Sequence, residues 1–200
     1  MIRRKIKRSL PPLLDRENLL NRIASRIRQS LELPEILETT AREIRAFLNT
    51  HRVKIYRFEE DGSGEVIAES IQRDRLPSML GLRFPSTDIP TKSRELFLSA
   101  RQRVIVDVAS GRKTTEDLDF SENGESISRG GIRYWPVDPC HGEYLTNMGV
   151  SSSLAIPILH QHHLWGLLVS HHGKPRRYSE REIEIVQLLV DQMSIAIAQS

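Results

Sequence analysis

The chain has 200 residues, with 29 Lys and Arg against 26 Asp and Glu and a formal net charge of +3. Hydrophobic residues make up 38% and charged residues 28%, a balance that supports a buried core and excludes a disordered chain. No apolar run approaches the ~20 residues of a membrane-spanning helix, and the basic start lacks the apolar segment of a secretory signal. The single cysteine cannot form an internal disulfide, so we expect a soluble protein of the reducing cytoplasm.

The positive charge is concentrated at the beginning of the chain. Residues 1–28 contain nine Lys and Arg against Asp15 and Glu17, whereas the rest of the chain is mildly acidic. A basic arm of this kind could contact phosphate or an anionic membrane surface. We prefer a solvated helix face, because no zinc-finger spacing or aromatic-rich basic strand indicates nucleic-acid binding.

In chain order, two amphipathic helices are expected first. Apolar residues at helical spacing predict a helix from Leu20 to Leu31 and a second one after Pro34. The apolar face of the second helix consists of Leu37, Ala41, Ile44 and Leu48. From residue 52 the period shortens to two, which predicts strands at 52–58 and 65–71 joined by the turn EDGSG.

The middle of the chain is predicted to be a helix, a strand and a long loop. The helix runs from Pro90 to about Arg101, and the strand covers 103–108. Residues 109–131 are polar and show no periodicity. A loop of this length inside a domain is usually functional, and we expect one here.

The last third is predicted to be a short helix, a hairpin and a long helix. Asp138 as N-cap, Pro139 and Gly149 delimit the short helix. Apolar strands at 152–159 and 164–172 flank the polar turn HQHH, and Ser179 with Glu182 forms a capping box for the final helix. Helices at both ends of an antiparallel sheet make an α+β domain. The apolar stripes of the terminal helices are expected to pack within the chain or to form a homodimer.

Cys140 is the first candidate for chemistry. It lies at the start of the predicted 138–149 helix, beside His141. The helix dipole and a neighbouring imidazole both favour the thiolate, and Cys140, Tyr144 and Met148 share one helix face. Spacing alone leaves a buried inert cysteine as an equal alternative. A thiol hydrolase would also need an orienting Asn or Asp and an oxyanion hole, and no motif indicates them.

The histidines do not predict a metal site. Three of them belong to the hairpin turn, and His171 and His172 must point to opposite faces of a strand. His171 ends an apolar strand and could point into a cavity. Asp88 lies in a turn that Pro85 and Pro90 stiffen, where it either caps the following helix or faces a ligand.

Three segments closely resemble the bilin-binding GAF domain of phytochromes. They are GLRFPSTDIP (81–90), DPCHGEYLTNMGVSSSLAIPI (138–158) and LWGLLVSHH (164–172). The resemblance covers residues 14–200 and leaves 1–13 as a basic leader. It implies a GAF fold, with a central antiparallel sheet, helices on its faces and long terminal helices. Since no PAS domain precedes it in this sequence, the PAS-less phytochromes are the expected group.

The resemblance also implies the function of the domain. A linear tetrapyrrole, expected to be phycocyanobilin, is joined to Cys140 by a thioether through self-catalysed attachment. Light isomerises the bilin between Z and E forms and toggles red- and far-red-absorbing states. The signal passes to a downstream PHY-type domain and an output module, expected to be a histidine kinase.

Further residues receive roles from the resemblance. His141 packs over the pyrroles near their nitrogens. Asp88 meets the pyrrole N–H groups through its carbonyl, and its side chain changes partners on photoconversion. Tyr56 and Tyr144 lie beside the last ring, and His171 reaches the carbonyl of that ring.

The remaining implied contacts are with the propionates. Arg103 binds one propionate, Arg133 is the best candidate for the second, and Ser153 contacts a propionate. Guanidinium groups suit this task because they pair with carboxylates in a fixed fork. The alternative function is a colourless GAF domain that binds a cyclic nucleotide or mediates dimerisation.

Overall fold

The computed structural model of the chain describes residues 18, 20–22, 25, 32–109, 112–117, 133–136 and 139–200, with only the backbone for 99–107, 112–117, 133–136, 139 and 140. The helices in these ranges are α2 (Leu33–Leu48), α3 (Thr91–Ser99), α4 (Pro139–Asn147) and α5 (Glu180–Gln199). The strands are β1 (Arg52–Phe58), β2 (Gly64–Ile71), β3 (Arg83–Phe84), β4 (Ala100–Asp107), β5 (Arg112–Asp117), β6 (Arg133–Pro136), β7 (Ser152–His160) and β8 (His163–His172). The basic leader, most of the predicted helix at 20–31 and the expected cap Asp138 lie outside the described residues.

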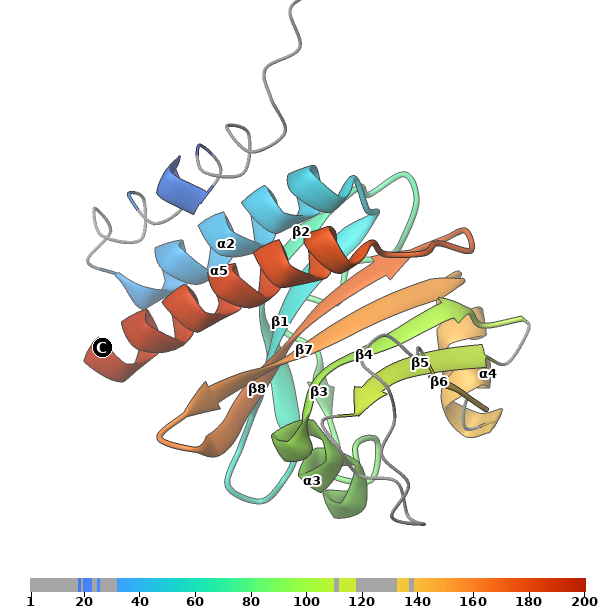
Figure 1. Ribbon diagram of the computed structural model, residues 1–200. Helices are drawn as coiled ribbons and strands as arrows, with labels where there is room; N and C mark the ends of the chain where they lie inside the picture. Colours follow the sequence, from blue (N-terminus) through green and yellow to red (C-terminus); the bar gives the residue numbers. More distant parts are fainter. Residues whose placement is uncertain are drawn as a thin grey trace, which may run out of the picture.

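The described strands form one antiparallel sheet in the order β3-β2-β1-β8-β7-β4-β5-β6 (Figure 1). β7 and β8 form the predicted hairpin, in which Gln161 and His162 make the two-residue turn. Both residues have positive φ, 49° and 66°, the signs that a right-twisted hairpin turn requires. β1 pairs with β8 and with β2, so the two predicted hairpins meet at the centre of the sheet. The α+β prediction is confirmed.

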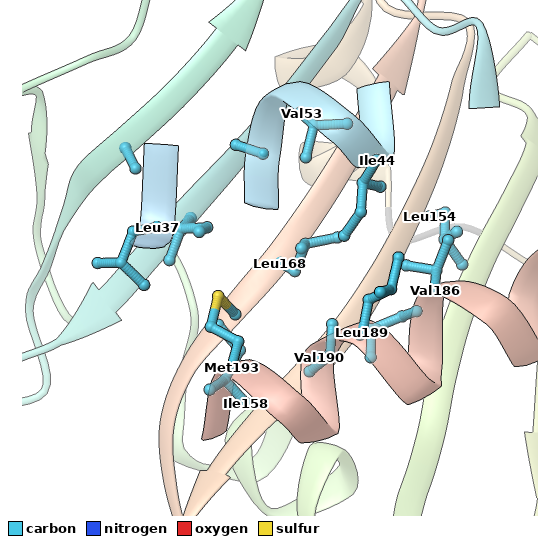
Figure 2. Close-up of a cluster of buried hydrophobic side chains, with 14 of the residues drawn as sticks. Leu37, Ile44, Val53, Leu154, Ile158, Leu168, Val186, Leu189, Val190 and Met193 are labelled. Carbon is cyan, nitrogen blue, oxygen red and sulfur yellow. The ribbon is translucent and has the colours of Figure 1, made fainter. Parts of the chain in front are cut away.

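α2 and α5 lie side by side across one face of the sheet (Figure 1). Their apolar stripes pack on alternate residues of the central strands, including Val53 of β1 and Leu168 of β8 (Figure 2). Each fully buried aliphatic side chain of this kind contributes roughly 1.5–3 kcal/mol. The predicted α5 stripe from Ile183 to Ile197 is thus used inside the chain, and a homodimer stays a prediction.

Two smaller clusters lie away from α2 and α5. The first joins the opposite side chains of the central strands to Phe97 of α3 and consists of Tyr56, Val66, Met79, Phe97, Ala155, Leu167 and Val169. The second, near α4, consists of Leu76, Val108, Leu145 and Val150. The central strands β1, β7 and β8 are therefore buried on both faces.

The helix ends follow the sequence signals where they are described. Ser179 accepts a hydrogen bond from the backbone of Glu182 and the Glu182 side chain returns one, which confirms the capping box of α5. Gly149 ends α4 with φ 71°, as the C-cap prediction requires. None of the described helices is long and apolar enough to cross a lipid bilayer.

The predicted loop at 109–131 is wrong in its first part. Arg112–Asp117 forms β5, which pairs with β4 on one side and β6 on the other. The segment RKTTED is polar throughout, so it lacks the apolar alternation by which a strand is recognised. β5 forms because β4 and β6 supply hydrogen-bonding partners on both of its sides.

Candidate functional site

The sheet face opposite α2 and α5 carries buried polar side chains among the apolar ones. Arg52 and Lys54 on β1 are 0% and 7% exposed, and His171 on β8 is 3% exposed. Charged residues are rarely buried this completely unless they are paired or belong to a site. We therefore take this face, with the loop and helix residues that cover it, as the candidate functional site.

Arg52 connects His171 to the loop that follows β2. Its Nη2 lies 2.8 Å from Nδ1 of His171, and its Nη1 donates to the carbonyl oxygen of Pro77 at 2.6 Å. Its Nε lies 4.0 Å from a carboxylate oxygen of Glu69, whose side chain is also buried. Burial above all, together with the positive charges of Lys54 and Arg52, holds the pKa of His171 well below its ordinary value. The imidazole is therefore neutral.

Lys54 is a second buried basic residue, two positions after Arg52 on β1. Its Nζ lies 3.4 Å from Sδ of Met79 and 5.5 Å from the centre of the Phe84 ring. Neither neighbour carries a negative charge. Burial and the adjacent charge of Arg52 lower the pKa of Lys54 to about 7, although Glu69 acts in the opposite direction. The site thus contains an amine that titrates near neutral pH.

Aromatic rings form one wall of the site. Phe84 lies between Tyr56, at 6.0 Å, and Tyr144, at 6.4 Å between ring centres. The Tyr56 hydroxyl is buried and has no hydrogen-bond partner within the described part of the chain. Gly64 faces this ring, and a Cβ at that position would overlap the phenol. The fold therefore makes room for Tyr56 and leaves its hydroxyl for another partner.

Asp88 lies close enough to influence both tyrosines. Burial first, and the negative charge of Asp88 second, raise the pKa of Tyr56 and that of Tyr144 to about 12. The backbone N–H of Asp88 donates to the carbonyl oxygen of Pro85 at 3.0 Å, which closes the turn. α3 begins only at Thr91, so Asp88 does not occupy the N-cap position of that helix. Asp88 is exposed, and its contact with a ligand stays a prediction.

α4 positions the predicted cysteine and its neighbours. Cys140 is the second residue of this helix, and its side chain lies outside the described part of the structure. The rings of His141 and Tyr144 are stacked with centres 6.3 Å apart. His141 is also close enough to His171 for its positive charge to help lower the pKa of His171.

The strand register places the three propionate candidates in two rows, with one further row between them. Arg103 pairs with Ala155 on one side and with Thr115 on the other, and Thr115 pairs with Arg133. The two arginines thus occupy one row of cross-strand partners, with a single strand between them. Ser153, which is 6% exposed, lies two rows from Arg103 and pairs with Ile105 of β4 and His171 of β8.

The structure brings together five of the predicted residues with described side chains: Tyr56, Asp88, His141, Tyr144 and His171. The sequence interpretation missed Arg52, Lys54 and Glu69, which lie among them. In the sequence RVKIYRF, the apolar Val53 and Ile55 alternate with charged residues, which normally indicates a solvent face. The one available signal was that Tyr56 and Phe58 share this charged face.

Among the residues that the structure describes, no group of three or more His, Cys, Asp and Glu could hold a metal ion. The hairpin histidines are consistent with this result, because His160, His162 and His163 surround the exposed β7–β8 turn. His171 and His172 differ in surroundings, as predicted. His171 is buried on the site face, whereas the His172 ring lies against that of His51, tilted by 40° with centres 3.9 Å apart.

Comparison with known proteins agrees with this architecture. The sequence model of the GAF domain matches residues 32–197, and the chain belongs to the GAF domain family. More particularly, the similar chains of known structure include GAF domains of cyanobacterial phytochromes. The phycoerythrobilin-bound GAF domain from a cyanobacterial phytochrome is 55% identical with a TM-score of 0.83, and the match covers 94% of this chain and 97% of that chain.

Two further relatives extend the comparison. The phycocyanobilin-bound GAF domain from a cyanobacterial phytochrome is 53% identical, with a TM-score of 0.81 and coverage of 96% of both chains. The phytochrome-like protein Cph1 of Synechocystis sp. is 36% identical over 174 residues, covering 82% of this chain and 22% of that protein. The chain thus spans about a fifth of the length of the curated relatives it matches.

Proposed function

We propose that this chain is a light-sensing domain that holds a linear tetrapyrrole on the site face of its sheet. The observation that carries the proposal is the buried Tyr56 hydroxyl, which lacks a partner in the described residues and faces a site lined by aromatic and basic side chains. Conjugated pyrrole rings suit such aromatic walls, and their carbonyl, N–H and propionate groups suit the polar atoms. Two similar GAF domains are bilin-bound, which supports the same assignment.

The residues present fit a bilin in specific roles. Cys140, at the start of α4, forms the thioether, and the helix dipole supports its thiolate. His141 packs over the pyrrole rings from the same turn of helix. Arg103 and Arg133, from one row of the sheet, bind the propionates together with Ser153.

The other end of the site holds the ring that moves. When bound, the bilin supplies light absorption and a double bond that isomerises between Z and E. Tyr56 and Tyr144 enclose the terminal ring, His171 donates to its carbonyl, and Asp88 accepts from ring N–H groups. The backbone of Asp88 is held by the turn that closes on Pro85, and its exposed carboxylate can accept from the ring N–H that each isomer presents.

The test is to express the chain with the enzymes that make phycocyanobilin. A coloured protein is expected, with pigment that stays on the denatured chain and an absorbance spectrum that red light shifts reversibly toward the far red. Cys140→Ala should lose the pigment on denaturation, whereas Thr146→Ala, an exposed change in the same helix, should retain it. A colourless chain, or pigment that remains with denatured Cys140→Ala, would contradict the proposal.

The identity of the bilin and of the output are finer parts of the proposal. Phycocyanobilin is favoured because the attachment cysteine lies inside the domain, and loading with phycocyanobilin or phycoerythrobilin in parallel tests that choice. The signal passes to a PHY-type domain and a histidine kinase, as the phytochrome resemblance implies. The rate of phosphotransfer by the full-length protein, compared under red and far-red light, tests this output. Equal rates would contradict the proposal of a light-regulated histidine kinase.

A further inference from the structure

The contact between Arg52 and His171 has a chemical consequence for the site. The two residues are direct partners in the β1–β8 register, and Nη2 of Arg52 lies 2.8 Å from Nδ1 of His171. A guanidinium group has only donors and stays protonated in proteins. Nδ1 must therefore be the acceptor of this hydrogen bond, which means that Nδ1 carries no proton.

The state of the other ring nitrogen follows from this contact. An imidazole that accepts at Nδ1 is neutral and carries its proton on Nε2. His171 is 3% exposed and lies near two further cations, Arg52 and Lys54. Adding a second proton would place another positive charge in this buried cluster, which is unfavourable.

Arg52 is itself held in place by the loop after β2. It donates from Nη1 to the Pro77 carbonyl oxygen at 2.6 Å, and the Glu69 carboxylate lies 4.0 Å from its Nε. Its side chain is 0% exposed. The hydrogen bond to Pro77 and complete burial leave this guanidinium little freedom to turn away from the imidazole, although its Nε has no hydrogen-bond partner among the described residues.

We propose that Arg52 is a positioning residue that holds His171 as the Nε2–H tautomer, so that His171 can only donate to the ligand. The partner of His171 is then an acceptor, a carbonyl oxygen, and not an N–H group of the ligand. This inference rests on the proposed function for the identity of the ligand, but the tautomer itself does not depend on it. Arg52 acts through His171 and does not need to touch the bilin.

The tautomer is measured by nitrogen-15 NMR of the full chain with labelled histidine, before and after loading with phycocyanobilin. His171→Gln identifies the signals of His171. A one-bond proton coupling is expected at Nε2 and none at Nδ1 in both samples, with the Nε2 signal shifted by loading. A protonated Nδ1, an imidazolium at neutral pH, or loss of the Nε2 proton on loading would overturn the proposal. A chain that does not take up bilin contradicts the proposed function, while the unloaded spectrum still decides the tautomer.

A double-mutant comparison distinguishes the proposed action of Arg52 on His171 from a role in anchoring the loop after β2 alone. Arg52→Met is expected to yield both His171 tautomers, to shift the absorbance maximum and to lower the amplitude of photoconversion. In the His171→Gln background, Arg52→Met should add no further shift, because its effect passes through His171. Arg57→Met, a partly exposed change on the same strand, should leave all three readouts unchanged. An equal shift in both backgrounds would overturn the proposal and assign Arg52 to loop anchoring alone.

Discussion

Replacing Lys54 by methionine is expected to stabilise the ligand-free chain and to change how its stability depends on pH. The side chain is 7% exposed, and burial lowers its pKa from 10.5 to about 7. The unfolded chain therefore binds more protons at this position than the folded chain between pH 7 and 10.5. In that interval the free energy of unfolding rises with pH, and at lower pH the stability is reduced by a constant amount.

The magnitude follows from the two pKa values. At pH 7 the lowered pKa reduces the free energy of unfolding by about 4 kcal/mol, and at pH 9.5 by about 1 kcal/mol. Lys54→Met has a side chain of similar length without the charge. It should therefore be more stable than the native chain at pH 7, and the difference should shrink by about 3 kcal/mol at pH 9.5. This upper pH stays below the range in which Tyr56 and Tyr144 titrate, since the pKa of each is raised to about 12.

Urea denaturation at several pH values between 6 and 9.5 measures this difference. Lys92→Met, an exposed change at the start of α3, is the matched control and should follow the native profile. Parallel profiles for the native chain and Lys54→Met would refute the reasoning, because they would show that the amine is solvated or fully paired. A buried lysine that makes the folded chain less stable than methionine would at the same position is expected mainly at functional sites.

Two further predictions concern Asp88 and Gly166. Asp88→Asn should bind bilin and form a near-normal red-absorbing state but accumulate roughly ten- to hundredfold less far-red form. The reason is the loss of a charge-assisted hydrogen bond of about 1.5–3 kcal/mol. Full far-red amplitude after saturating red light would contradict this prediction. Gly166→Ala should lower the free energy of unfolding by about 1–3 kcal/mol or more, since its Cβ would overlap the carbonyl oxygen of Tyr56. A urea midpoint equal to that of the native chain would show that β1 and β8 can separate to admit the methyl group.

The elements with a clear apolar period were predictable from the sequence. The stripe of α2 and the alternation of Val53 and Ile55 in β1 match the core under the helices, because the period of a helix or strand selects one face for burial. The continuous apolar runs of β7 and β8 match their burial on both faces. The capping box at Ser179 was also found, since it depends on local residues alone. β5 was missed because its residues are polar throughout and it forms only through pairing with β4 and β6.

The candidate site was predictable only in part. Tyr56, Asp88, His141, Tyr144 and His171 were named through the family resemblance, which carries information about distant contacts. Arg52 and Lys54 could not be found from the pattern of their strand, because a charged alternate face is the usual sign of solvent. Their burial is decided by residues far along the chain, such as Met79 and Phe84, that cover this face.

The two-sided burial of β8 makes this strand a mechanical link between the site and the long helices. Leu168 packs in the cluster under α2 and α5, while the next residue on each side, Leu167 and Val169, packs in the cluster that faces the site. Close-packed interiors have few voids that could absorb a displacement. A shift of the β8 backbone that accompanies a change of partner at His171 would therefore pass through Leu168 into the cluster that β8 shares with α2 and α5, without any loop between them.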